Sequence, residues 1–184
     1  MNLLEMILNA DNDGPVREVA RRFGMREDDA RNAISQIVPA LSRGISRNVS
    51  QQGGLENLLN ALSQGNHHRY VDHPEELARP EPITDGNSIL GHILGSKDVS
   101  RNVAGHAAVN TGFDANVLKQ MLPMVAAMVM GVLGKQASGT GSLGALPGGG
   151  GSPSGLPEIL GTFLDADRDG SIMDDLLGLA KKFF

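Results

Sequence analysis

The sequence contains no cysteine and no tryptophan, and its 184 residues include one tyrosine. Without cysteine there is no disulfide framework, no thiolate nucleophile and no cysteine-ligated zinc site. Aromatic residues make up 3% of the chain, which disfavours a β-sandwich because strands are rich in aromatic and β-branched side chains. The 24 glycines and 8 methionines favour closely packed helices, so we expect an all-α fold.

The chain lacks an excess of basic charge: 16 lysines and arginines stand against 21 acidic residues, and the net charge is −5. Nucleic acids and anionic membranes attract basic surfaces, and neither is an expected partner. The uncharged, strongly apolar run 120–134 would span roughly 22 Å as a helix, against about 30 Å of bilayer hydrocarbon. A buried helix is therefore expected there. The N-terminal residues lack the features of a signal peptide, and we expect a cytoplasmic location.

Two parts of the chain resemble each other, which predicts an internal duplication. Each copy reads as a short apolar helix, a second helix after a polar turn, and a longer third helix after a glycine turn. Three blocks match in the same order: residues 16–20 with 99–104, 23–25 with 111–113, and 34–39 with 118–123.

Local signals support these helices. Asp11 or Asp13 could cap the second helix, and Asp28 or Asp29 the third. The apolar spacing from Val16 to Phe23 and from Ile34 to Leu41 places one buried face on each helix. Pro39 and Pro123 fall inside the predicted third helices, where each removes a backbone hydrogen bond.

Composition divides the chain into five parts. A first repeat over 1–64 ends in a short helix at 55–62, and a polar, loop-like connector follows over 65–85. The second repeat covers 86–137. A linker rich in Gly, Ser and Pro covers 138–156. An acidic tail with a helix–loop–helix pattern is predicted over 157–184.

The acidic tail carries the most specific chemical pattern. Asp165, Asp167 and Asp169 alternate before Gly170, which permits a sharp turn. Carboxylates so spaced can point at one centre and supply oxygen ligands to Ca²⁺ or Mg²⁺. The run resembles EF-hand and dockerin-like loops over 165–171. That resemblance implies calcium ligands at the three aspartates, the Ser171 carbonyl, and Asp174 or Asp175.

The tail pattern departs from an EF-hand at its last ligand. Position 12 of the loop, where an EF-hand has a bidentate glutamate, is Leu176. A weak site is therefore expected, and the alternative is an acidic turn that caps the next helix.

Two other groups could hold a metal ion. Residues 9–14 repeat the oxygen spacing, but a helix-capping turn explains them fully. His67, His68, Asp72 and His73 could offer zinc ligands, although histidines in a loop are more often solvated. His92 and His106 have no evident partner in the sequence. We therefore expect surface or packing roles for all five histidines.

Residues 16–34 resemble a helix-turn-helix, which gives a DNA-binding regulator as the alternative function. Five arginines support that reading: Arg17, Arg21, Arg22, Arg26 and Arg31. The start of the would-be recognition helix has Glu27, Asp28 and Asp29 instead, and carboxylates there repel phosphate.

The duplicated unit and the acidic tail together resemble the bacterial family catalogued as domain of unknown function 937. The motifs that carry the resemblance are residues 23–25 and 111–113, residues 36–39 and 120–123, and the tail from 165 to 175. The resemblance implies a bacterial, mostly helical protein with no assigned activity.

Catalytic motifs such as GxSxG, GxxxxGK and HExxH do not occur in the sequence. We expect a non-enzymatic interaction module without catalytic or cofactor-binding residues. Its tail would bind calcium or magnesium weakly, and its partner would be another protein or a second copy of the chain.

Overall fold

A computed structural model describes residues 3–139, which contain helices and no strand. The all-α prediction is thus confirmed. The first predicted repeat contains α1 (Leu3–Leu8), the 3-10 turn η1 (Ala10–Asp13), α2 (Gly14–Phe23), α3 (Glu27–Val49) and α4 (Gly54–Gln64). The remaining elements are α5 (Arg69–Asp72), the 3-10 turn η2 (Pro74–Ala78), α6 (Glu81–Leu94), α7 (Lys97–Thr111) and α8 (Ala115–Gly139).

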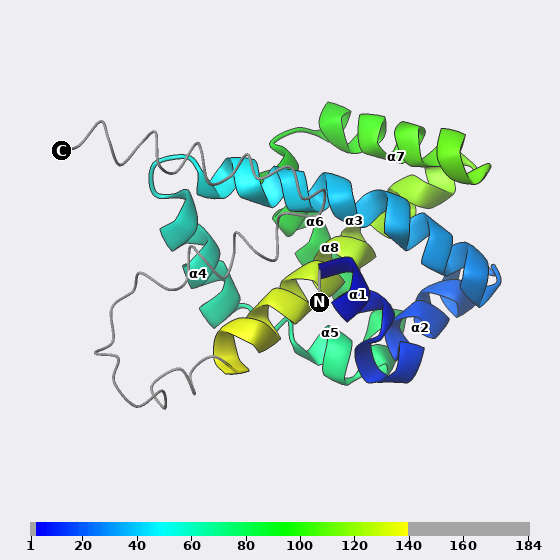
Figure 1. The fold of residues 1–184 in the computed structure, drawn as a ribbon, viewed down its shortest axis with the longest axis horizontal. Coiled ribbons are helices and arrows are strands. Elements are labelled where there is room, and N and C mark those ends of the chain that lie inside the picture. Colours follow the sequence, from blue (N-terminus) through cyan, green and yellow to red (C-terminus); the bar gives the residue numbers. More distant parts are fainter. Residues whose placement is uncertain (1–2, 140–184) are drawn as a thin grey trace.

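Helix α8 runs through the middle of the molecule, with the other helices around it (Figure 1). It contacts each of α1 to α7, and every residue from 121 to 134 is buried. A helix surrounded on all sides must be apolar on all sides, which explains why its sequence lacks a polar face.

The segment Ala115–Gln136 has a mean hydropathy of 1.6, enough in length and composition to cross a membrane. However, 83% of its most apolar stretch is buried inside the fold. The expectation of a buried helix is confirmed: α8 forms the centre of the hydrophobic core.

The predicted buried faces are also present. On α2, Val16, Val19 and Ala20 are buried and Phe23 is partly buried, and on α3 the residues from Ile34 to Leu41 that follow helical spacing are buried. Pro39 and Pro123 lie inside α3 and α8, as predicted. The buried apolar residues of α2, α3 and α8 belong to one continuous core that both predicted repeats share.

The second helix of each predicted repeat ends in the same way. Gly24 after α2 and Gly112 after α7 have φ values of 64° and 76°, a left-handed conformation that favours glycine. Their N–H groups donate to the carbonyls of Ala20 and Ala108. Two helices followed by a longer third occur as α1, α2 and α3 and again as α6, α7 and α8. The duplication itself stays a prediction.

The predicted aspartate caps are wrong. Asp13 precedes α2 with a left-handed φ of 67° and makes no capping hydrogen bond; it forms an ion pair with Arg31 at 3.0 Å. Helix α3 begins at Glu27, so Asp28 and Asp29 lie in its first turn. Asp29 pairs with Arg26. The carboxylates of Asp13 and Asp29 therefore form ion pairs with arginines instead of the predicted hydrogen bonds to backbone N–H groups.

The connector over 65–85 is largely helical, which corrects the loop-like prediction. It contains α5, η2 and the first residues of α6. Tyr70, Val71 and Leu77 are buried in the core, and this burial holds the short helices in place despite their polar neighbours. Pro82 lies in the first turn of α6, a position where proline favours helix initiation.

Candidate functional site

A cleft of about 600 Å³ lies between the C-terminal half of α3, α4 and α6. Met130 of α8 contributes to its lining, together with Ile45, Val49, Leu58, Ala61, Ile89 and Ile93. Its volume falls within the range typical of ligand sites, which combine an apolar lining with a few polar groups. We call this space the α4–α6 cleft.

The polar residues of the cleft come mainly from the ends of α3 and α4 and from α6: Asn48, Asn57, Gln64, His67, Asp85, Ser88 and His92. Asp85 is the one carboxylate among the lining residues, and no lysine or arginine lines the cleft. The cleft is therefore apolar with a single negative charge.

Asp85 anchors a hydrogen-bonded cluster beside the cleft. The hydroxyl of Tyr70, the sole tyrosine, donates to Asp85 Oδ2 at 2.5 Å. Arg69 Nη2 donates to Tyr70 Oη at 2.7 Å and lies 3.5 Å from Asp85 Oδ2. The Arg69 guanidinium also lies over the Tyr70 ring, 4.8 Å from its centroid. These contacts join α5 to α6 through side chains.

Burial changes the acid–base behaviour of Tyr70. The residue has no exposed surface, and desolvation, followed by the hydrogen bond to Asp85, raises its pKa from 10.0 to about 12. The hydrogen bond to Tyr70 is the main cause that raises the pKa of Arg69. The cluster therefore holds a neutral phenol between a carboxylate and a guanidinium at neutral pH.

His67 lies at the junction of the cluster and the cleft. Its Nδ1 atom is 3.8 Å from Asp85 Oδ2 and has no hydrogen-bond partner among the described residues. Desolvation lowers the pKa of His67 below its ordinary value of 6.5, and the negative charge of Asp85 opposes that shift. A neutral imidazole is thus favoured beside the apolar lining.

A glycine of α8 fixes the position of this junction. A β-carbon on Gly131 would lie 2.6 Å from the His67 carbonyl oxygen and 2.8 Å from Val71 Cγ2. The backbone at His67 can approach α8 only because position 131 lacks a side chain.

The structure does not gather the connector histidines around a metal. His68 is exposed, Asp72 forms an ion pair with Lys135 at 2.5 Å, and His73 Nδ1 is 3.5 Å from Glu75. Within residues 3–139, no group of three or more His, Asp or Glu side chains could hold a metal ion. His92 and His106 are exposed, in agreement with the expected surface roles.

Residues 9–14 form a tight turn rather than a metal loop. Asp11, Asn12 and Asp13 all have left-handed φ values, at 41°, 52° and 67°. The Asp13 carboxylate is paired with Arg31, as described above. The structure supports the turn, but not the capping hydrogen bond that the sequence predicts with it.

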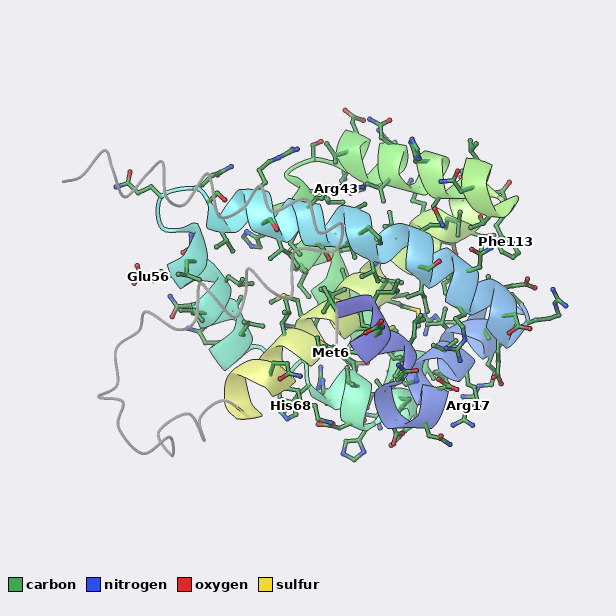
Figure 2. All side chains as sticks on the ribbon, in the orientation of Figure 1. Met6, Arg17, Arg43, Glu56, His68 and Phe113 are labelled. Atoms are coloured by element: carbon green, nitrogen blue, oxygen red, sulfur yellow. The ribbon has the colours of Figure 1, made fainter. Side chains whose placement is uncertain are left out.

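Four of the five arginines of residues 16–34 contact other groups of the described chain. Arg21 pairs with Glu18 and Arg26 with Asp29. Arg31 pairs with Asp13, and Arg22 donates to the carbonyls of Leu77, Ala78 and Arg79. In the described part of the chain, Arg17 alone among the five makes no such contact; it lies on the outside of α2 (Figure 2). This arrangement gives the DNA-binding alternative little support.

The predicted calcium ligands lie outside the described residues. This applies to Asp165, Asp167, Asp169, Ser171, Asp174 and Asp175, and to the rest of the predicted tail and most of the linker. They stay predictions from the sequence.

Residues 5–136 match the family model described as bacterial protein of unknown function (DUF937). The chain belongs to this family. No curated protein and no solved structure matches it. The resemblance noted from the two glycine turns and the two proline-ended segments is thereby confirmed.

The DUF937 match covers every element from α1 to Gln136 of α8, apart from the first residues of α1. The α4–α6 cleft and the cluster of Arg69, Tyr70 and Asp85 therefore lie inside the matched region, and the acidic loop lies beyond it. Sequence reasoning missed this cluster. Its one available signal was the presence of a single tyrosine in an otherwise polar connector.

Proposed function

We propose that this DUF937 chain is a non-enzymatic interaction module that binds an apolar polypeptide segment in the α4–α6 cleft. The observation that carries the proposal is the cleft itself, which is lined by seven apolar side chains from four helices. Grooves between helices commonly receive an amphipathic segment whose apolar residues enter the groove.

The composition of the cleft supports a polypeptide more than a charged metabolite. Its deepest lining residues, Ile45 and Met130, are at most 2% exposed, and its exposed polar residues lie on surface helices. Asn57, Ser88 and His92 are exposed, so they could contact the polar side of a bound helix or extended segment.

A photo-crosslinking experiment tests this proposal. Ser88 lines the cleft, while Thr84 is exposed one turn earlier on α6 and does not line it. A photoreactive phenylalanine analogue at position 88, in the full chain inside the bacterium that makes it, should form adducts with polypeptide. The same group at position 84 is the matched control. Equal adduct yields from the two positions would argue against binding in the cleft.

The acidic tail adds a second part to the proposal, a weak site for Ca²⁺ or Mg²⁺. It rests on the alternation of Asp165, Asp167 and Asp169 before Gly170. The displaced last ligand at Asp174 or Asp175 favours modest affinity. In this role the ion would order the tail rather than catalyse a reaction.

Calorimetry with calcium and with magnesium tests the tail. The full chain should release or absorb heat at millimolar ion, and an Asp165→Ala/Asp169→Ala variant should show heats of dilution alone. An Asp11→Ala/Asp13→Ala variant is a control because it also removes two carboxylates, from a turn whose acids belong to no group of three or more possible metal ligands within residues 3–139. Equal binding of the ion by the wild type and by the tail variant would contradict a metal site in the tail.

A further inference from the structure

We infer that the segment that occupies the α4–α6 cleft is the chain's own C-terminal segment, residues 176–184, bound within the same molecule. This inference rests on the proposed function, because it names the polypeptide that the cleft receives. It draws on the position of the end of α8, on the charge of the cleft and on the sequence of the segment.

The end of α8 brings the remainder of the chain close to the cleft. Met130 lines the cleft, and the helix continues past it alongside α4, where Gly134 faces Leu62. Figure 1 shows the last turns of α8, in yellow, beside α4. From Met130 to Gly139 the helix advances only about 14 Å.

The chain between α8 and residues 176–184 is long enough for this segment to reach the cleft. Residues 140–175 separate Gly139 from the segment, and a chain of that length can span up to about 120 Å when extended. Because the segment is covalently attached, its local concentration at the cleft far exceeds that of a free partner.

Charge selects residues 176–184 over the preceding part of the tail. The cleft has Asp85 as its single charged lining residue. Residues 157–175 contain six carboxylates and one arginine, whereas residues 176–184 contain Lys181 and Lys182 and no acid. An ammonium is attracted to Asp85, and the acidic run is repelled by it.

Asp85 has room for such a partner. Tyr70 and Arg69 both contact its Oδ2 atom, and the carboxylate side chain remains 33% exposed. His67 Nδ1 is buried 3.8 Å from the same Oδ2 atom, so the acceptor that a ligand in the cleft can reach is the Asp85 carboxylate. A lysine ammonium can donate three hydrogen bonds and needs acceptors of this kind.

The apolar residues of the segment suit the rest of the cleft. Six of its nine residues are apolar: Leu176, Leu177, Leu179, Ala180, Phe183 and Phe184. It thus combines a cationic pair with large apolar side chains, the complement of an apolar cleft that carries one carboxylate.

Disulfide trapping in the full chain tests this inference, and the absence of native cysteine makes it specific. One variant carries Ser88→Cys and Phe183→Cys, and the matched control carries Thr84→Cys and Phe183→Cys. Positions 84 and 88 are both exposed and lie one turn apart on α6, so the tether alone would give similar rates of oxidation. Docking should make the 88–183 disulfide form at least about tenfold faster, within a monomer.

Three outcomes would overturn the inference. They are equal rates for the two pairs, a disulfide that joins two chains, and a fast 88–183 rate that persists when Lys181→Glu and Lys182→Glu are added. A rate that these two changes lower to the control value supports the role of Asp85. Circular dichroism confirms that each variant is folded.

The two proposals fail separately. If the photoreactive group at position 88 traps a different protein while the cysteine pairs show no preference, the interaction module stands and the docking of residues 176–184 is wrong. If position 88 traps no polypeptide and the cysteine pairs show no preference, both are wrong.

Discussion

Gly86 of α6 lies directly against the backbone of Pro123 in α8. A β-carbon built on Gly86 would be 1.9 Å from the Pro123 carbonyl oxygen and 2.4 Å from its carbonyl carbon. The two helices therefore meet backbone to backbone, and neither partner is a flexible side chain that could move aside. This close crossing fixes the position of α6 against α8, and so the positions of Asp85 and Ser88, which α6 carries.

The substitution Gly86→Ala should destabilise the protein by about 3 kcal/mol, because the added methyl group must push two backbones apart. Urea unfolding followed by circular dichroism measures the loss. Gly91→Ala, on the same helix, is the control, since a β-carbon there meets nothing within 4 Å. That change should stabilise the helix by up to about 1 kcal/mol. Similar effects at the two positions would contradict the close crossing.

Tyr70 should ionise with a pKa of about 12 in the folded protein. The ultraviolet absorbance of tyrosinate reports this residue alone, because the chain has one tyrosine and no tryptophan. In urea the same titration should return to about 10.

The raised pKa of Tyr70 also sets the sign of the alkaline stability change. The stabilisation that Tyr70 gives to the folded state through this shift is fully present below pH 10, and it is lost as the pH rises from about 10 toward 12. A folded-state titration that matches the titration in urea would show that the phenol is not buried against Asp85.

His67 should make the fold sensitive to mild acid. Because burial lowers its pKa in the folded state, the unfolded chain takes up the proton first, and stability falls as the pH drops below about 6.5. The urea midpoint should therefore fall less between pH 7.5 and pH 5.5 in His67→Gln than in the wild type. His106→Gln, at an exposed position on α7, is the control and should behave as the wild type does.

Arg22 should matter for stability and Arg17 should not. Arg22 Nη1 lies 2.9 Å from the carbonyl oxygens of both Leu77 and Ala78, near the end of η2. Arg22→Ala removes a charged donor from these carbonyls and should cost about 1–2 kcal/mol in urea unfolding. Arg17→Ala, on the same helix, should change stability by less than about 0.5 kcal/mol. Equal losses would mean that the η2 contact contributes nothing.

The sequence predicts the helices of this fold better than their ends. The spacing of Val16, Val19 and Ala20 is a property of one segment, so it reveals the buried face of α2 without knowledge of the rest. The cap of the same helix depends on Arg31, far along the chain, which takes the Asp13 carboxylate. Local patterns could not show that competition.

The candidate site could not be predicted from the sequence, again because it depends on contacts between separate segments. Tyr70 and Asp85 lie 15 residues apart, on α5 and α6 with η2 between them, and their hydrogen bond depends on how α5 and α6 pack on α8. The sequence of the connector reads as polar because its buried residues are few and lie among charged ones: Tyr70, Val71, Pro74, Leu77 and Pro82. Burial of so few side chains leaves no periodic pattern to detect.

The central position of α8 has a consequence for synthesis on the ribosome. This helix is made after α1 to α7, yet it contacts all of them. Until it is translated, the apolar faces that pack on α8 in the finished fold stay uncovered, although α3 already offers a surface to several of the earlier helices, and these uncovered faces are open to aggregation or to chaperones. The core is therefore completed only after residues 115–139 have been synthesised.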